Sequence, residues 1–474
     1  MAQQDRMPPG SILRQIPQVE KLLHLPLVEA IVARTSRVEV TEALRAIVAE
    51  ARNQVLLGEV SEEGLGARLS EAGILCRLEE VLEERRLSAY RRVINATGVI
   101  LHTGLGRAVL APRALAALGN ALRGYSVVEL DLETGERNRR EEAIAEILSG
   151  LTGAESATAV NNNAAATLLI LAALARGKEV LVSRGQLVEI GGSFRIPDIL
   201  QESGARLVEV GTTNRTYIDD YRRALSPETG LLLKVHTSNY EIRGFVHHTP
   251  LEELVALGKE RGVPVVSDLG SGCFVDLSPH GFQREPLVSE SVRAGADLVC
   301  FSGDKLLGGP QSGIILGKNE WIQAIRAHPL FRAFRVDKVT LVLLEATLRA
   351  YLDPDTLRDS IPTLHAIMEP AESVRLRALS CLERARLASK GLVMEVVPSS
   401  AQAGSGALPA QEIPSHALAL EHPEMSADET ARALRLGKPP VIPRIHDGRV
   451  ILDFRTVIEG DEEDIAMAIA ALSR

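Results

Sequence analysis

Apolar positions recur at intervals of three and four along the first ninety residues, as they do in amphipathic helices. Segments 17–35 and 40–56 carry Leu, Val and Ile at this spacing. Residues 61–92 continue the pattern and include the charge-dense run LEEVLEERRL, which is typical of a solvated helix face. The pattern predicts a helical domain over residues 1–60 and a helical linker over residues 61–92.

From Val93 onward, short apolar runs rich in β-branched residues alternate with helical stretches and glycine-rich turns. This alternation predicts an α/β domain over residues 93–340, with a mostly parallel sheet covered by helices on both faces. A long helix and a smaller α/β domain are expected over residues 341–474. The sequence His446-Asp447-Gly448 there is a hairpin signal.

Composition narrows the class of protein. With 45% hydrophobic and 24% charged residues, the chain reads as globular. The longest apolar stretch, residues 164–175, is too short to span a bilayer, and the N-terminus has no apolar signal core. The four cysteines form no CxxC pair, so neither a metal site nor a disulfide framework is expected. We therefore expect a cytoplasmic protein without a membrane partner.

Charge and aromatic content bear on nucleic-acid binding. The formal net charge of −9 and the small aromatic set of 8 Phe, 6 Tyr and 1 Trp argue against a non-specific polyanion binder and against a base-stacking platform. Residues 1–58 hold seven basic and six acidic residues, so the acidity lies in the rest of the chain. A protein that reads the shape of one folded RNA is still compatible with this balance.

Lys305 is the first candidate for chemistry. It follows the apolar run ADLVCFSG and begins the glycine-rich segment KLLGGPQSG. Ligands of parallel α/β sheets bind at the carboxyl ends of the strands, and glycines let a cofactor approach the backbone. Ser302, at the end of the same run, is a second candidate for a cofactor contact. An ordinary surface lysine is the alternative.

Asp268 ends the apolar run VPVVSD and is followed by two glycines in LGSG. A carboxylate at this edge of the sheet can pair with a protonated pyridine nitrogen and so keep the ring an electron sink. The alternative is a helix-capping or turn aspartate.

Three asparagines end a strand and begin a long apolar helix in the segment AVNNNAAATLLILAAL. Asn162, Asn163 and Ala164 would then present side chains and free backbone N–H groups to an anion such as a 5′-phosphate. Asn is also a common cap, so this signal is weak alone. In the order Asn-rich cap, Asp268, Lys305, however, the three motifs have the layout of fold type I pyridoxal-phosphate enzymes.

Arginines supply a possible anion clamp. Arg107 lies in the glycine loop TGLGRA, and Arg332 and Arg335 are three residues apart in HPLFRAFRVDK. Three guanidinium groups converging on Lys305 would bind an anion, which for a free amino acid would be its α-carboxylate. Each could instead be a surface or ion-paired arginine.

These motifs resemble those of bacterial selenocysteine synthases, the L-seryl-tRNA(Sec) selenium transferases. The resemblance covers nearly the whole chain and rests on distinctive segments: LRQIPQVEKLL, RRVINATGVILHTGLGRA, NNNAAA, SRGQLVEIGGSFRIPDI, KVHTSNYEIRGF, SDLGSG, SGDKLLGGPQ and GKPPVIPRIHDGRVILDFRTV. It implies a fold type I enzyme with Lys305 bound covalently to pyridoxal phosphate and Asp268 beneath the pyridine nitrogen. It also implies that residues 1–60 bind tRNA, and that the enzyme is a ring-shaped homodecamer built from dimers.

The resemblance implies a reaction in two stages. The β-hydroxyl of seryl-tRNA(Sec) is eliminated, with freed Lys305 removing the α-proton, and selenium from selenophosphate is then added. Because the seryl carboxyl is esterified and uncharged, the arginines are free to hold another anion. Arg107, Arg332 and Arg335 are then expected to bind the phosphate of selenophosphate.

Some positions depart from the family pattern, and two other functions stay open. Gly104 replaces Asn, while Asn138 and Arg139 replace Gly and Ser, which affects loops near the expected site. A lyase for small phosphorylated amino acids would share the core but lack the N-terminal helices. A tRNA-binding scaffold without turnover would not need Lys305 and Asp268.

Overall fold

The computed structural model describes residues 13, 16–57, 60, 62–86, 88–192, 194–409 and 411–473. The chain forms two compact units, residues 1–92 and residues 93–474. Residues 1–12, 14 and 15 of the predicted N-terminal domain lie outside the described residues. No described helix is long and apolar enough to cross a membrane.

The first unit is built from helices, as the apolar periodicity predicts. Its helices are α2 (Val19–Leu23), α3 (Pro26–Arg34), α4 (Arg37–Leu56), α5 (Glu62–Leu69) and α6 (Glu71–Arg86). Leu44 and Ile47 of α4 share one core with Leu65 of α5 and with Ile74 and Leu78 of α6. The predicted division between residues 60 and 61 therefore falls inside this core. Apolar periodicity shows that a helix is amphipathic, but it does not show which neighbouring helix covers its apolar face.

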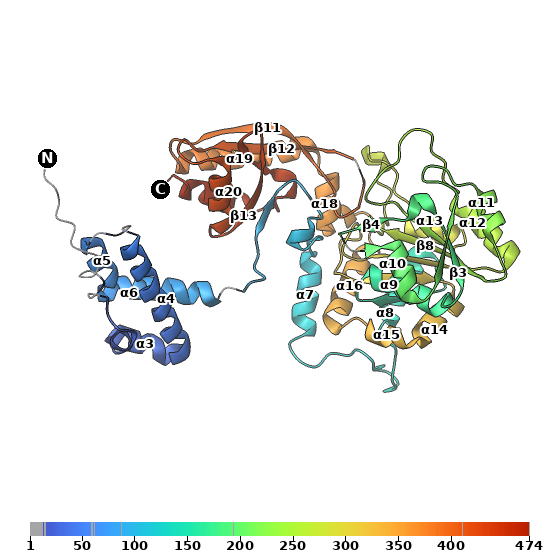
Figure 1. Cartoon of the computed structure of the whole chain (residues 1–474), viewed down its shortest axis with the longest axis horizontal. Helices are drawn as coiled ribbons and strands as arrows, with labels where there is room; N and C mark the ends of the chain where they lie inside the picture. The colour runs from blue at the N-terminus through green and yellow to red at the C-terminus, as the bar shows by residue number, and fades with distance from the viewer. Residues whose placement is uncertain are drawn as a thin grey trace. The chain divides into compact units, whose positions relative to one another are not determined.

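A seven-stranded sheet forms the centre of the second unit (Figure 1). In spatial order its strands are β2 (Ser156–Val160), β10 (Gly313–Gly317), β9 (Leu298–Ser302), β8 (Val265–Gly270), β7 (Thr229–Val235), β3 (Glu179–Ser183) and β6 (Arg206–Val210). Strand β10 runs antiparallel to both of its neighbours, and the other pairs are parallel. The predicted mostly parallel sheet is confirmed.

Helices cover both faces of this sheet. Ile314 and Leu316 of β10 pack into one core, and Ile315 packs into the core on the other face. The first face carries α8 (Glu142–Thr152), α11 (Ile218–Ala224), α12 (Leu251–Arg261), α13 (Val288–Arg293) and α16 (Lys338–Ala350). The second carries α9 (Asn163–Leu174), α10 (Ile196–Ser203) and α14 (Asn319–Ala327). Burial on both faces explains why the strands are continuous apolar runs rather than alternating ones.

A second sheet of five strands forms the small C-terminal layer. Its order is β1 (Ile94–Ala96), β13 (Val441–His446), β14 (Arg449–Asp453), β12 (Ile413–Glu421) and β11 (Val393–Ala401). It packs against α19 (Ala371–Ala388), α20 (Ala427–Leu436) and α21 (Glu462–Ala471). Asp447 and Gly448 form the two-residue turn between β13 and β14 with φ of 48° and 72°, which confirms the predicted hairpin.

Two features cross the predicted boundaries within this unit. Strand β1 pairs in parallel with β13, so a segment from the start of the predicted core completes the C-terminal sheet. Helix α16 spans the predicted boundary at residue 340 and packs against α8 and α7 (Pro112–Ala121). The small layer is therefore assembled from both ends of residues 93–474.

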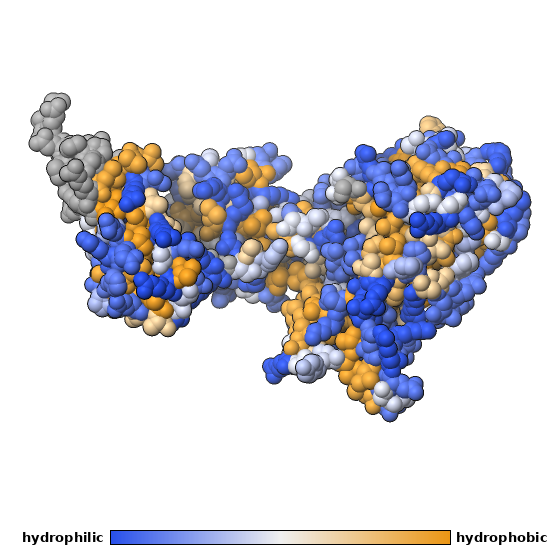
Figure 2. Space-filling view, turned by 60° about the horizontal axis from the view of Figure 1, so that its bottom comes forward, coloured by the Kyte–Doolittle hydropathy of each residue, from blue (hydrophilic) through white to orange (hydrophobic). Residues whose placement is uncertain are grey.

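Apolar side chains are exposed on α7 and around it. Figure 2 shows hydrophobic surface on the part of this unit that projects at the bottom of the view. The exposed apolar residues of this region are Val109, Leu115, Val127, Leu130 and Leu132. Exposed apolar side chains gathered in one region are typical of an interaction site.

Candidate active site

The predicted chemical residues meet at the carboxyl ends of neighbouring strands. Asp268 lies in β8, Lys305 follows β9, and the Asn-rich cap follows β2. A cavity of about 320 Å³ opens at this edge of the sheet. All seven predicted residues of this group line it: Arg107, Asn162, Asn163, Ala164, Asp268, Ser302 and Lys305. The strand-end rule for parallel sheets therefore located the cavity from the sequence.

Asp268 is almost completely buried, with 4% of its surface exposed. Asn163 Nδ2 donates to its Oδ1 (2.9 Å), Thr167 Oγ1 to its Oδ2 (3.0 Å), and the Gly270 N–H to its Oδ1 (3.1 Å). Burial raises the pKa of Asp268, although these donors oppose the rise. A buried carboxylate held in place by neutral donors is suited to pair with one further N–H, and a protonated pyridine nitrogen supplies such a group.

Two buried polar atoms at the cavity have no hydrogen-bond partner, namely Asn163 Oδ1 and Ser238 Oγ. Buried polar groups are normally paired, so unpaired ones at a cavity indicate a missing ligand. Together with the carboxylate of Asp268, they fit a planar heteroaromatic cofactor that carries polar substituents.

Lys305 is 5% exposed and lies in the same cavity. Burial lowers the pKa of its amine, and the positive charge of Arg107 lowers it further. A lowered pKa increases the fraction of neutral amine, which is the form that attacks a carbonyl. A neutral amine at this place in the cavity has the chemistry needed to react with an aldehyde.

The N-terminus of α9 supplies a candidate phosphate site. The Asn162 side chain caps the helix by accepting from the Ala165 N–H at 2.8 Å. The first N–H groups of a helix have no acceptor within the helix and favour an anion. A Cβ on Gly313 of β10 would lie 2.1 Å from the Asn162 carbonyl oxygen, so only glycine lets this strand pass so close to the cap.

Two residues of the cavity, Asp304 and His236, and one partner outside its lining, Glu285, were not predicted. Asp304 accepts from Arg107 Nη1 at 2.8 Å, and its position beside Lys305 in the sequence could have indicated it. His236 Nε2 lies 3.0 Å from Glu285 Oε2, and this buried carboxylate also accepts from the Leu408 N–H. Glu285 lies in a loop without periodicity, so nothing in the sequence connects it to the site.

Arg332 and Arg335 do not line this cavity. They line a second one, of about 460 Å³, which contains other arginines: Arg137, Arg139, Arg140 and Arg326. Within one chain the structure therefore brings Arg107, but not the other two predicted clamp residues, to Lys305. Arg335 is nevertheless joined to the Asn-rich segment, because its backbone pairs with Val160.

The second cavity also holds the residues that depart from the family pattern. Asn138 and Arg139 both line it, and the Asn138 N–H donates to the Glu129 carbonyl oxygen at 3.1 Å. Hydrogen bonds from Arg140 and Arg137 hold the pKa of the Glu129 carboxyl at about 2. Gly104 lies elsewhere, in the short turn Thr103–Leu105 before Arg107.

Two known protein families match this chain. Residues 93–458 match the family described as L-seryl-tRNA selenium transferase, and residues 13–52 match the selenocysteine synthase N-terminal family. The L-seryl-tRNA(Sec) selenium transferase of Moorella thermoacetica is 47% identical over 97% of this chain and 96% of its own length. That of Geobacter metallireducens is 46% identical over 98% of this chain and 100% of its own.

Among solved structures, D-glucosaminate-6-phosphate ammonia-lyase is similar in fold. It has a TM-score of 0.55 and 21% identity, and the match covers 83% of this chain and 98% of that one. The architecture is that of fold type I, as predicted. The extent of the family match and the identity to full-length relatives lead to one conclusion: the chain belongs to the L-seryl-tRNA selenium transferase family.

Proposed function

We propose that this protein converts seryl-tRNA(Sec) to selenocysteinyl-tRNA(Sec) with pyridoxal phosphate as cofactor and selenophosphate as selenium donor. The observation that carries the proposal is the meeting of buried Asp268 and Lys305 in one cavity of a chain that belongs to this family. When bound, pyridoxal phosphate supplies an electron sink that makes the α-proton of an attached amino acid acidic.

Each residue of the cavity would have its own role in binding the cofactor or in moving a proton. Asp268 holds the proton on the ring nitrogen, and Asn163 and Thr167 keep that carboxylate in position. Lys305 would hold the cofactor covalently and would serve as the base for the α-proton of the seryl group. The start of α9, with Asn162, Asn163 and Ala164, and the nearby Ser302 hold the cofactor phosphate.

Arginines are the proposed ligands of selenophosphate. Arg107 lies at Lys305, where selenium must reach the β-carbon. Arg332 and Arg335 line the arginine-rich cavity. The backbone of Arg335 pairs with Val160, and Asn162, two residues further along the chain, lines the cavity of Lys305. Guanidinium groups bind phosphate through paired hydrogen bonds. The seryl ester has no carboxylate to compete for them.

The proposed partners follow from the rest of the chain. Residues 13–52 match the N-terminal family, which supports tRNA binding by the first unit. The exposed apolar residues around α7 support a homo-oligomer, because a second copy would cover them (Figure 2). The ring-shaped decamer stays a prediction from the resemblance, and the cytoplasmic location stays one from the composition.

A selenium-transfer assay tests the proposal. Purified enzyme with selenophosphate should form selenocysteinyl-tRNA from seryl-tRNA(Sec) and little from seryl-tRNA(Ser). The Lys305→Ala variant should lose both the product and the visible band of covalently bound cofactor. Failure to form product, with ammonia release from a small phosphorylated amino acid instead, would favour the lyase alternative.

A further inference from the structure

Glu285 is a buried carboxylate that the roles assigned so far do not explain. It is 5% exposed and lies in the irregular segment before α13. Among the described residues, its one ion-pair partner is His236, and no lysine or arginine lies within ion-pair distance. A buried charged group generally stabilises a fold less than an apolar side chain of similar size. Its position therefore points to a role in the site rather than in folding.

Three hydrogen-bond donors converge on this carboxylate. His236 Nε2 lies 3.0 Å from Oε2, the Ser271 hydroxyl donates to Oε2 at 3.3 Å, and the Leu408 N–H donates to Oε1 at 3.0 Å. Burial alone would raise the pKa of Glu285, but the hydrogen bond and charge of His236, together with the other two donors, hold it below its ordinary value. Glu285 is therefore ionised, and Nε2 of His236 carries the hydrogen that it accepts.

Two of the donors belong to strand ends that form the active site. His236 follows β7, lines the cavity of Lys305, and donates its backbone N–H to the Asp268 carbonyl oxygen at 2.8 Å. The Ser271 carbonyl oxygen accepts from the N–H of Leu306, the residue after Lys305, at 3.2 Å. The buried carboxylate thus connects the segments that carry the histidine, the ring-binding aspartate and the reactive lysine.

The third donor comes from the loop between β11 and β12. Leu408 has a φ of 48°, a left-handed conformation that residues other than glycine rarely adopt. Strained backbone of this kind persists where the surrounding structure fixes it, and it is common at active sites. Two residues earlier, a Cβ on Gly406 would lie 3.1 Å from Ser238 Oγ, so the same loop contacts the wall of the cavity. The C-terminal layer therefore helps to hold Glu285 in place.

Elimination of the seryl hydroxyl needs a proton donor as well as a base, because hydroxide is a poor leaving group. Five side chains with an acidic or basic group line the cavity: Arg107, His236, Asp268, Asp304 and Lys305. Lys305 is the proposed base, and Asp268 is the proposed partner of the ring nitrogen. Asp304 is paired with Arg107. Of these five, His236 is the one without an assigned role.

The contact with Glu285 suits His236 to donate a proton. With Nε2 engaged, the ring nitrogen left for a ligand is Nδ1, which forms no hydrogen bond to any described residue. A doubly protonated ring places its positive charge against the ionised carboxylate and carries a hydrogen on Nδ1. The His236 side chain is 25% exposed, so the ring is not closed off from a substrate in the cavity.

We propose that His236 is a catalytic residue whose Nδ1 protonates the departing β-hydroxyl, and that Glu285 is the residue that positions it. The Cβ–O bond breaks, and the oxygen takes the proton of His236 and leaves as water. Lys305 takes the α-proton, and the electron pair of that C–H bond forms the carbon–carbon double bond. One proton is lost by His236 and one is gained by Lys305, so both residues are restored when one proton returns through solvent. This proposal rests on the proposed function and supplies the acid for its first half-reaction.

The leaving group tests the acid role. tRNA(Sec) is charged with serine or with 3-chloroalanine, and single-turnover consumption of each is measured with the full-length enzyme. Chloride leaves without a proton, so His236→Phe should slow consumption of the seryl group about 100-fold and that of the chloroalanyl group less than about 3-fold. Equal loss with both substrates would overturn the proposal. A wild-type enzyme that consumes neither would count against the proposed function itself.

Glu285→Gln tests the positioning role. The amide keeps the shape of the side chain but has one acceptor oxygen instead of two, so one of the three converging donors loses its partner. The variant should slow the seryl reaction about 10-fold and leave the chloroalanyl reaction nearly unchanged. In a His236→Phe background it should cause no further loss, because both changes remove the same proton donor. A further loss in that background would overturn the action of Glu285 through His236.

Cofactor capture supplies a readout that does not depend on turnover. Burial and Arg107 lower the pKa of the Lys305 amine, whereas Asp268, Asp304 and Glu285 raise it. Glu285→Gln removes one of these negative charges, so the pKa of Lys305 falls and the neutral amine is reached at lower pH. Capture by the full-length protein should therefore shift to lower pH. An unshifted profile would overturn the placement of an ionised carboxylate at the site.

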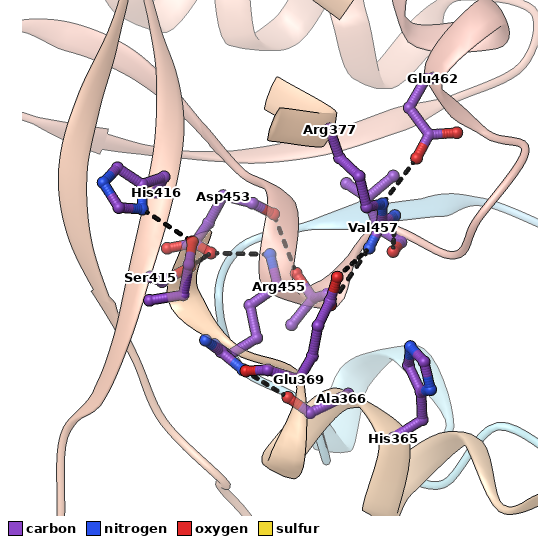
Figure 3. A network of polar contacts seen from close by, with 12 residues as sticks. His365, Ala366, Glu369, Arg377, Ser415, His416, Asp453, Arg455, Val457 and Glu462 are labelled. Atoms are coloured by element: carbon purple, nitrogen blue, oxygen red, sulfur yellow. Dashed lines mark hydrogen bonds and ion pairs between the residues drawn. The ribbon is translucent and has the colours of Figure 1, made fainter. Parts of the chain in front are cut away.

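Glu369→Gln is the matched control. Glu369 is also a buried carboxylate, at 7% exposure, but it accepts from Arg377 at 3.3 Å rather than from a residue of the Lys305 cavity (Figure 3). This variant should leave both elimination reactions and the pH profile of cofactor capture unchanged. If it reproduced the selective loss seen with Glu285→Gln, the loss would come from removing any buried carboxylate, and the proposal would be wrong.

Discussion

Arg107 Nη1 lies 2.8 Å from Asp304 Oδ2, and Asp304 immediately precedes Lys305 in the chain. This ion pair holds a guanidinium group beside the reactive lysine. Burial, and next the charge of Arg107, lower the pKa of the Lys305 amine. The Arg107–Asp304 ion pair thus links the residue proposed to bind selenophosphate to the reactivity of Lys305.

Arg107→Ala should shift cofactor capture to higher pH. Loss of the positive charge raises the pKa of Lys305, so a smaller fraction of the amine is neutral at a given pH. Capture at neutral pH should slow roughly 2- to 10-fold. The measurement is the rate at which the bound-cofactor band appears in apo-enzyme across pH. Arg332→Ala, in the other cavity, should leave the profile in place; the same shift in both variants would contradict the local effect.

Thr167→Val should weaken cofactor binding. The variant removes the donor to Asp268 Oδ2, so the pKa of this carboxyl rises further. The ionised carboxylate of Asp268 holds the proton on the cofactor ring, so cofactor binding weakens as the pH falls through the pKa of Asp268. The variant should therefore begin to release the cofactor at a higher pH than the wild type. Loss of a hydrogen bond to a charged group predicts about a tenfold increase in the cofactor dissociation constant.

A matched threonine serves as the control for that experiment. Thr152 is also buried and donates to a helix carbonyl, that of Leu148, whereas Thr167 donates to Asp268 as well. Thr152→Val should change stability without changing the pH of cofactor release. If both variants released the cofactor alike, the effect would be one of general packing.

Arg332→Ala and Arg335→Ala should reduce selenium transfer more than elimination. Both side chains line the arginine-rich cavity, whereas Asp268 and Lys305 line the other. The two half-reactions are measured as consumption of seryl-tRNA(Sec) and as selenium incorporation. Arg222→Ala, at an exposed pair with Asp219, is the control and should affect neither. Equal loss in both half-reactions would argue against a donor clamp.

Two truncations should behave differently. Removal of residues 1–60 leaves Leu65, Ile74 and Leu78 without the helices that cover them, so the remaining protein should aggregate. Removal of residues 1–92 follows the boundary between the units and should give a protein that binds the cofactor but not tRNA. Gel filtration, the cofactor band and filter binding of tRNA(Sec) measure these outcomes. Retained tRNA affinity without residues 1–92 would contradict the role of the first unit.

The sequence predicted what depends on strong local patterns. Central strands buried on both faces are continuous apolar runs, and residues at their carboxyl ends necessarily meet, which placed Asp268 and Lys305 in one cavity. The turn at Asp447 and Gly448 needs positive φ at two positions, and its residues indicate this directly.

Local sequence patterns did not predict contacts between segments that are distant in the chain or irregular in structure. The pair His236–Glu285 joins a strand end to a loop with no periodicity. The spacing of Arg332 and Arg335 predicts one shared face if the segment is helical, but α15 (Pro329–Ala333) ends before Arg335, which pairs with Val160 instead. The spacing also does not say which cavity the two side chains line. Which helix packs on α4 depends on side-chain shape, and apolar period alone carries no such information.

The pairing of β1 with β13 constrains the order in which the protein can be completed during synthesis. Residues 94–96 leave the ribosome long before residues 441–443, to which they pair. The central sheet, whose strands end at residue 317, can form while the nascent chain still lacks that partner. The C-terminal layer is completed only when translation is nearly finished. A product truncated before residue 441 therefore holds every strand of the central sheet but leaves β1 without its partner.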